Sequence, residues 1–231
     1  MVSTEDGKVM NSNILYEDNH IIVVIKEPNI PVQEDISKDP DMLTIIKDYL
    51  KQKYKKPGNV YLGLVHRLDR PVGGVMVFAK TSKAASRLSD LIRKGEFNKT
   101  YLALVHGKLL KDSDTLEDYL LKDTKTNTSK VVTEDIGKKS ILEYDVIDYN
   151  ESTDLSLLKI TLHTGRHHQI RVQLSNIGHP IYGDQRYGKD KVGIQIHLWS
   201  TEISFKHPVR DEIMTFENIP IWAEGVAYEK E

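Results

Sequence analysis

The chain has 231 residues, 39% of them hydrophobic, which is enough for a core of enzyme size, and a formal charge of −2 at pH 7. It contains no cysteine, which excludes disulfides, thiolate chemistry and cysteine-bound zinc. Residues 1–13 resemble no targeting peptide, and no apolar run approaches the ~20 residues of a membrane span, so we expect a cytoplasmic protein. The net charge disfavours a nonspecific nucleic-acid binder, although basic residues cluster locally around Arg67, Arg93 and Arg166.

The first predicted elements are strands over 14–16 and 21–25, which flank a tight turn. Apolar residues at helical spacing predict a helix from Asp41, and alternating apolar residues predict a strand over Val60–Leu64. A buried strand is expected over Val75–Ala79.

The second half begins with a helix that we expect Ser82 to cap and Gly95 to end. A strand over Thr100–Gly107 is expected to lie beside the Val60–Leu64 strand, and Lys122–Lys130 is expected to be an exposed loop. A turn after Thr164 leads into a short helix, and further strands are expected over 141–146, 155–163, 194–199, 203–205 and 213–216. Many strands, few helices and no linker predict one domain of α+β class, built on a large, mixed and mainly antiparallel sheet.

The segment Leu64–Gly74 is the first candidate for a functional site, because an apolar strand there runs into charged residues and a glycine pair. Asp69 is the candidate catalytic residue, since a loop of this kind holds a reactive side chain at the edge of a rigid sheet. Taken alone, an aspartate before a Pro-Gly turn is more often a turn residue that binds its own backbone. The local pattern therefore needs support from elsewhere in the chain.

Other catalytic classes find less support in the sequence. Four histidines suggest a metal site, but none lies in a metal-ligand motif: His66, His163, His167 and His168. A glycosidase would need a second carboxylate opposite Asp69, and nothing in the spacing of Glu96 or Asp184 marks either as that acid. The chain also lacks a nucleophile-elbow, phosphate-binding or dinucleotide-binding motif.

Two further side chains could complete a site around Asp69. If they converge, Arg171 on the short helix would hold the carboxylate ionised through a bidentate pair, and Tyr101 would stack on a planar base. Judged individually, a core tyrosine and a surface ion pair are the more common structural explanations.

Four motifs, taken together in chain order, resemble the RluA-type pseudouridine synthase family. They are His66-Arg-Leu-Asp69, Lys99–Gly107, Thr164–Arg171 and Gly178–Asp184. The resemblance implies isomerisation of uridine to pseudouridine in structured ribosomal or transfer RNA, without metal or organic cofactor, on a mixed-sheet fold. The glycosidic bond is inaccessible inside a base stack, so the uridine must be flipped out.

The resemblance also implies roles for individual residues. Asp69 matches the catalytic aspartate, Tyr101 the tyrosine that stacks on the base, and Arg171 the arginine paired with the aspartate. Val172 matches an apolar base contact and Arg67 the arginine that enters the RNA. Further RNA contacts are expected from basic and polar residues elsewhere: His66, Arg70, Lys80, Arg93, Lys94 and Arg166.

The chain departs from the family pattern at two places. Pro71–Gly74 replaces the frequent Thr-Ser-Gly, which predicts altered loop packing. We also expect no amino-terminal S4 RNA-binding domain: a polar tail over 1–13, a catalytic domain over 14–222 and a tail over 223–231 make up the expected organisation, as a monomer. Two alternatives stay open, an RNA-binding factor without chemistry and a hydrolase that releases free base or sugar.

Overall fold

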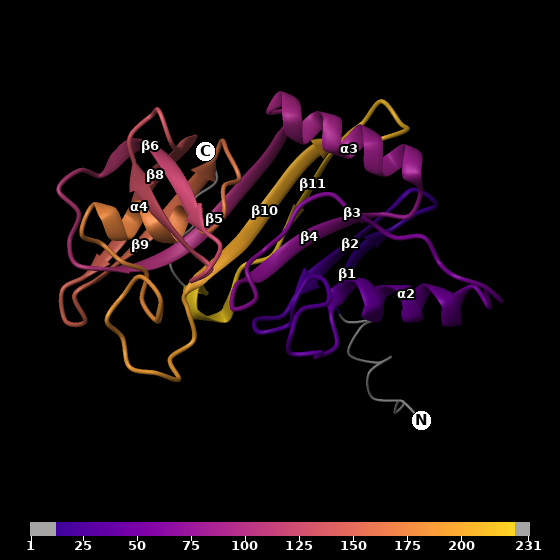
Figure 1. Cartoon of the computed structure of the whole chain (residues 1–231), viewed down its shortest axis with the longest axis horizontal. Coiled ribbons are helices and arrows are strands. Elements are labelled where there is room, and N and C mark those ends of the chain that lie inside the picture. The colour runs from indigo at the N-terminus through magenta and orange to yellow at the C-terminus, as the bar shows by residue number, and fades with distance from the viewer. Residues whose placement is uncertain (1–12, 225–231) are drawn as a thin grey trace. The chain divides into compact units, whose positions relative to one another are not determined.

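The computed structural model describes residues 13–224, which form eleven strands, three α-helices and one 3-10 helix (Figure 1). The predicted α+β class with a large, mainly antiparallel sheet is confirmed. Residues 1–12 and 225–231, which make up most of the two predicted tails, lie outside the described residues. No helix within 13–224 has the length and apolarity that a membrane crossing requires.

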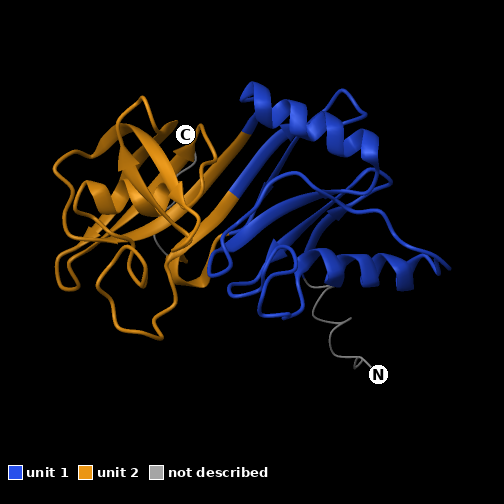
Figure 2. Cartoon of the chain, in the orientation of Figure 1, with its two compact units in different colours: residues 1–97, 202–218 blue, residues 98–201, 219–231 orange. Residues whose placement is uncertain are grey.

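The chain divides into two compact units (Figure 2). Unit 1 consists of residues 1–97 and 202–218, and unit 2 of residues 98–201 and 219–231. Strand β10 (Leu198–Lys206) contributes residues to both units. The limits of one catalytic domain over 14–222 stay a prediction.

Unit 1 contains the strand order β1-β2-β4-β10, with β11 beside β10 and β3 beside β4. The pairs β1–β2, β2–β4, β3–β4 and β10–β11 are antiparallel. Its elements, besides its share of β10, are β1 (Ile14–Glu17), β2 (Ile21–Lys26), α2 (Met42–Lys53), β3 (Gly63–Leu64), β4 (Gly73–Ala79), α3 (Ser82–Lys94) and β11 (Ile213–Glu217).

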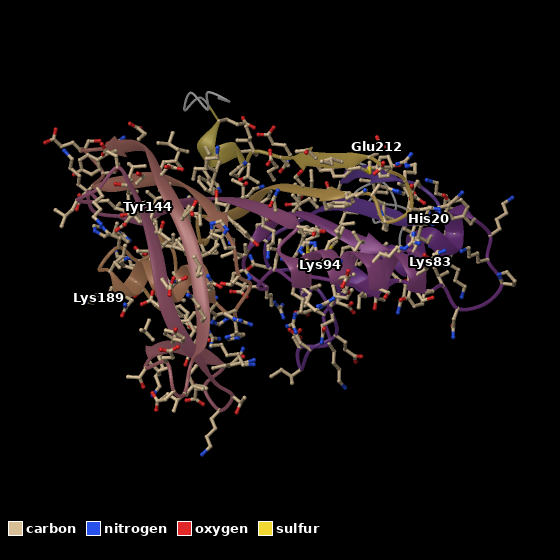
Figure 3. The ribbon with its side chains drawn as sticks, turned by 90° about the horizontal axis from the view of Figure 1, so that it is seen from above. His20, Lys83, Lys94, Tyr144, Lys189 and Glu212 are labelled. Atoms are coloured by element: carbon tan, nitrogen blue, oxygen red, sulfur yellow. The ribbon has the colours of Figure 1, made fainter. Side chains whose placement is uncertain are left out.

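The core of unit 1 forms where α3 packs on the sheet. Ala84 and Leu88 of α3 are fully buried in one apolar cluster with Val23 of β2 and Val77 of β4. The strands of this unit lie between α2 and α3 in Figure 1. Lys83 and Lys94 mark the beginning and the end of α3 in Figure 3.

Unit 2 contains the strand order β10-β5-β9-β8-β6-β7, and α4 contacts β6 and β7. The pairs β5–β9, β9–β8, β8–β6 and β6–β7 are antiparallel. Tyr144, labelled in Figure 3, lies on β8. Besides its share of β10, unit 2 consists of β5 (Phe97–His106), whose first residue falls in unit 1, β6 (Ser113–Asp123), β7 (Thr128–Val132), β8 (Lys138–Asn150), β9 (Leu155–Leu162), α4 (Gln169–Asn176) and η1 (Ile221–Ala223).

Most predicted elements are present, and in unit 1 the errors concern the limits of the elements. The predicted strand Val60–Leu64 is reduced to the two residues Gly63–Leu64, although Val60 and Leu62 are buried. Gly73 and Gly74 belong to the start of β4 and are not part of the preceding turn. The cap of α3 is Thr81, whose side chain accepts the N–H of Ala84, and not Ser82.

In unit 2 tertiary pairing overrode local composition. The predicted loop Lys122–Lys130 is a β-hairpin, in which Asp123 of β6 pairs with Thr128 of β7, and its β-branched threonines suit a strand. Of the strand expected over 194–199, only Leu198 and Trp199 lie in a strand, and they continue without a break through the strand expected over 203–205 as β10. β5 has β10 and β9 as neighbours, so its expected place beside the Val60–Leu64 strand is wrong.

Candidate active-site residues

Asp69 lies in an irregular segment of unit 1 that a tight turn closes. The N–H of Val72 donates to the carbonyl of Asp69 at 3.0 Å, and β4 begins one residue later. Asp69 is half-buried and lies four residues before the start of β4. This placement fits the predicted role of a reactive carboxylate held by the sheet.

Lys26, at the end of β2, holds the turn that contains Asp69. Its side chain is fully buried, and Nζ donates to the carbonyls of Arg70 at 3.0 Å, Val72 at 2.7 Å and Glu27 at 3.1 Å. Burial lowers the pKa of Lys26 to about 7, although the negative charge of Asp69 acts in the opposite direction. The buried amino group therefore fixes the backbone on the carboxyl side of Asp69 through its hydrogen bonds.

Lys26 was not among the predicted site residues, yet the sequence contains a signal for it. The lysine follows a run of five apolar residues, 21–25, and occupies a strand position in that buried element. A charged residue that extends a fully buried strand needs polar partners inside the fold.

His66 and Arg70, two predicted substrate contacts, both have partners inside unit 1. His66 Nε2 accepts the N–H of Val77 at 3.1 Å, which requires that nitrogen to be unprotonated. Arg70 forms ion pairs with Asp35 and Asp39. By contrast, Arg67 is exposed.

The basic residues predicted to contact RNA farther along the chain are also paired. Lys80 binds the carboxylate of Glu17 at 2.6 Å, and only 9% of its side chain is exposed. The charge of Lys80 therefore has a counter-charge inside the protein and needs no RNA to compensate it. Arg93 and Lys94 both pair with Asp90. In unit 2, Arg166 is exposed, and its Nε donates to the carbonyl of Lys139 at 3.0 Å. Their RNA contacts stay predictions.

Arg171, on α4 in unit 2, is held by a buried bidentate pair with Asp184. Its Nε donates to Oδ2 at 2.7 Å and its Nη2 to Oδ1 at 2.8 Å, with side-chain exposures of 6% and 0% for Arg171 and Asp184. Burial alone would raise the pKa of Asp184, but Arg171 and the backbone N–H groups of Arg186 and Tyr187 lower it. The bidentate pair uses Nε and Nη2 of Arg171, and it fixes the plane of the guanidinium.

An aromatic and polar cluster surrounds the guanidinium. The Tyr187 ring lies 5.2 Å from Cζ of Arg171, and its hydroxyl accepts the N–H of Ser129 and bonds Nδ1 of His168. The His167 ring stacks on that of His168, at 3.7 Å between centroids. These contacts give structural roles to His167 and His168, two of the four histidines that had suggested a metal site. Within residues 13–224, no group of three His, Asp or Glu side chains is arranged to hold a metal ion.

Tyr101 and Val172 complete the set of predicted residues in unit 2. Tyr101 lies on β5 opposite Ile160 of β9 and is 5% exposed, while Val172 on α4 is 4% exposed. The structure therefore brings Arg171 together with Asp184, which the sequence offered only as an alternative acid. Asp69 belongs to unit 1, whereas Tyr101 and Arg171 belong to unit 2.

The fold is shared with solved RNA pseudouridylate synthase domains. Human RNA Pseudouridylate Synthase Domain Containing 4 superposes with a TM-score of 0.78 over 94% of this chain and 92% of that chain, at 21% identity. Human RNA Pseudouridylate Synthase Domain Containing 1 gives a TM-score of 0.73 over 90% of this chain and 83% of that chain, also at 21% identity. At these identities the likeness defines the class of fold.

The sequence itself defines the family. Residues 20–176, more than half of the chain, match the family described as RNA pseudouridylate synthase. The chain is 35% identical to an uncharacterized RNA pseudouridine synthase, YjbO, of Bacillus subtilis over 88% of this chain and 71% of that protein. It is 33% identical to ribosomal large subunit pseudouridine synthase C of Buchnera aphidicola over 90% of this chain and 67% of that protein. The chain thus belongs to the RNA pseudouridine synthase family, whose members are isomerases.

Proposed function

We propose that this protein converts specific uridines of structured RNA into pseudouridine, with Asp69 as the catalytic carboxylate. The observation that carries the proposal is the family match over residues 20–176, which includes Asp69, Tyr101 and Arg171. Relatives named for the ribosomal large subunit support ribosomal RNA as the substrate. Transfer RNA, a cytoplasmic location and a monomeric state remain predictions of the sequence.

The proposed reaction is an isomerisation that needs no co-reactant. The bond from N1 of uracil to C1′ of the ribose breaks, the base turns, and a bond forms from C5 to C1′. The proton on C5 leaves, and N1 gains one, so atoms and charge balance. A single carboxylate can support this sequence, either by attacking C1′ or by stabilising positive charge on the sugar.

Four further residues have roles in the proposal. Tyr101 stacks on the flipped base and takes part in proton transfer, and Arg171 orients the carboxylate of Asp69. Val172 contacts the base. Arg67 fills the space that the uridine vacates in the RNA.

The structure supports these roles through rigidity. The three carbonyl contacts of Lys26 fix the turn that follows Asp69. The bidentate pair with Asp184 fixes the guanidinium of Arg171 before any substrate binds. Groups held in advance lose little freedom in the transition state, which is a main source of enzymatic rate enhancement.

The decisive test uses RNA that carries tritium at C5 of uridine. Pseudouridine formation releases this label into water, and the Asp69→Asn variant should release it at least roughly 10³-fold more slowly, because the carboxylate charge is lost while its shape is kept. Asp211→Asn, at an exposed carboxylate on the β10–β11 turn, is the matched control and should keep full activity.

The other outcomes separate the alternatives. Release of free uracil by the wild-type protein would identify a hydrolase. RNA binding without any tritium release from total cellular RNA would identify a binding factor. Full activity of Asp69→Asn would remove Asp69 from its role.

A further inference from the structure

Lys99 is a half-buried lysine of β5 to which the proposed chemistry assigns no role. It precedes Tyr101 by two residues, and side chains two apart on a strand share one face of the sheet. Lys99 therefore lies on the same face of β5 as the tyrosine proposed to stack on the base. Both residues belong to unit 2.

Among the described residues, 13–224, no carboxylate forms an ion pair with Lys99. Other lysines of the protein have acidic partners: Lys53 and Lys80 bind Glu17, and Lys111 binds Asp114. Within residues 13–224, Lys99 has neither an ion pair nor a hydrogen bond from its ammonium group. Burial lowers the pKa of Lys99. A desolvated, uncompensated cation is costly to the fold, so its presence calls for a ligand.

The ammonium group reaches the turn that leads into α4. A Cβ built on Gly165 would lie 3.5 Å from Nζ of Lys99, so the two residues are in contact distance of each other. Because Gly165 has no side chain, it leaves the ammonium group uncovered on that side. The same turn precedes the helix that carries Arg171 and Val172.

We propose that the ammonium group of Lys99 binds a phosphate of the substrate RNA beside the Gly165 turn, on the face of β5 that carries Tyr101. This inference rests on the proposed function. A lysine ammonium is a compact point charge with three donors, which suits a phosphodiester oxygen. A nucleotide placed on Tyr101 brings its own phosphates, so an anion accompanies the base whatever the surrounding RNA sequence.

The test measures RNA binding separately from turnover. Fluorescence anisotropy with a labelled 12-nucleotide oligouridylate gives the association constant at several KCl concentrations. The salt slope is the slope of the logarithm of this constant against the logarithm of the KCl concentration. Lys99→Met should weaken binding roughly tenfold and reduce that slope by about 0.7, the value for one phosphate contact on a single strand. Lys99→Arg should keep the slope, because it keeps the charge. Lys111→Met is the matched control, because Lys111 already has a carboxylate partner in the same unit.

A thermal melt distinguishes a binding residue from a structural one. Removing an uncompensated buried charge should leave the melting temperature of Lys99→Met unchanged or raise it. An unaltered salt slope in Lys99→Met would overturn the proposal, and a lower melting temperature beside it would identify Lys99 as a structural residue. An equal effect of Lys111→Met on the slope would also overturn the proposal.

Failure of the proposed function gives a different pattern. If the wild-type protein releases no tritium but Lys99→Met weakens RNA binding, the proposed isomerase function fails and the phosphate contact stands. If the wild-type protein releases tritium but Lys99→Met leaves the salt slope unchanged, the phosphate contact fails and the isomerase function stands.

Discussion

The helices α3 and α4 are stabilised in opposite ways. α3, with 13 residues, has a side-chain cap at Thr81, a left-handed glycine at Gly95 and only two buried residues. α4 has 8 residues, begins at His168 in a left-handed conformation with no side-chain cap, and buries six of its residues, 169–174. Three of those six are polar: Gln169, Arg171 and Gln173.

The difference shows where each helix obtains its stability. The ends of α3 satisfy their own backbone groups and the helix needs the sheet only for its apolar side. α4 is too short to persist alone and is held by hydrogen bonds from its buried polar side chains to neighbouring strands and loops. Those bonds also fix the direction of Arg171, so the helix that carries a proposed catalytic residue is the one that tertiary contacts hold.

The largest effect is expected from breaking the pair that anchors α4. Asp184→Asn keeps the shape of the side chain but leaves the Arg171 guanidinium buried without its counter-charge. We expect a loss of about 3–5 kcal/mol in the free energy of unfolding, measured with urea, and a fall in tritium release. Asp211→Asn should leave the urea midpoint unchanged, since that carboxylate is exposed.

The same variant should change the pH dependence of stability. The folded-state pKa of Asp184 lies below its usual value, so the stability that its carboxylate contributes is complete above the unfolded pKa of about 3.9 and is lost as pH falls through the folded-state pKa. The wild-type protein should therefore lose more stability than Asp184→Asn between about pH 5 and pH 2. Parallel stability curves for the two proteins would show that Asp184 is not stabilised as the carboxylate.

A smaller effect is expected from the contact between α4 and β6. Gln173 Nε2 donates to Asp118 Oδ2 at 2.8 Å and to the carbonyls of Leu116 at 3.2 Å and Ser140 at 3.4 Å, while Oε1 has no hydrogen-bond partner within 13–224. Gln173→Met removes these donations but also removes the buried, unpaired oxygen. We expect a net loss of about 1–2 kcal/mol by urea unfolding, below that of Asp184→Asn. A gain in stability would mean that the unpaired oxygen outweighs the hydrogen bonds from Nε2.

The contrast between the helices also explains what the sequence could predict. α3 was predicted with its correct end because Gly95 and the apolar spacing are local signals. α4 was expected as a short helix after the turn at Thr164, but that expectation did not mark Arg171 as buried. A residue that is buried because Asp184 lies 13 positions away gives no local signal.

The candidate site follows the same rule. Asp69, Tyr101 and Arg171 were identified through motifs, which encode family membership, and their joint action remains a proposal. Lys26 and the Arg171–Asp184 pair depend on contacts between distant segments, such as Lys26 with Val72, and only the structure shows them. Periodicity predicts burial along one element and cannot assign partners on another.

The smallest effect concerns the start of α3, where sequence and structure place the cap on different residues. Thr81→Ala removes the oxygen that accepts the Ala84 N–H at 3.2 Å, and should cost about 1 kcal/mol in urea unfolding. Ser82→Ala, one residue later at an exposed position, should change stability by less than about 0.5 kcal/mol. Thr81→Ala removes a methyl group besides the hydroxyl, so a larger cost for Ser82→Ala would return the cap to the residue that the sequence predicted. Because α3 depends on its own ends, neither substitution should alter tritium release.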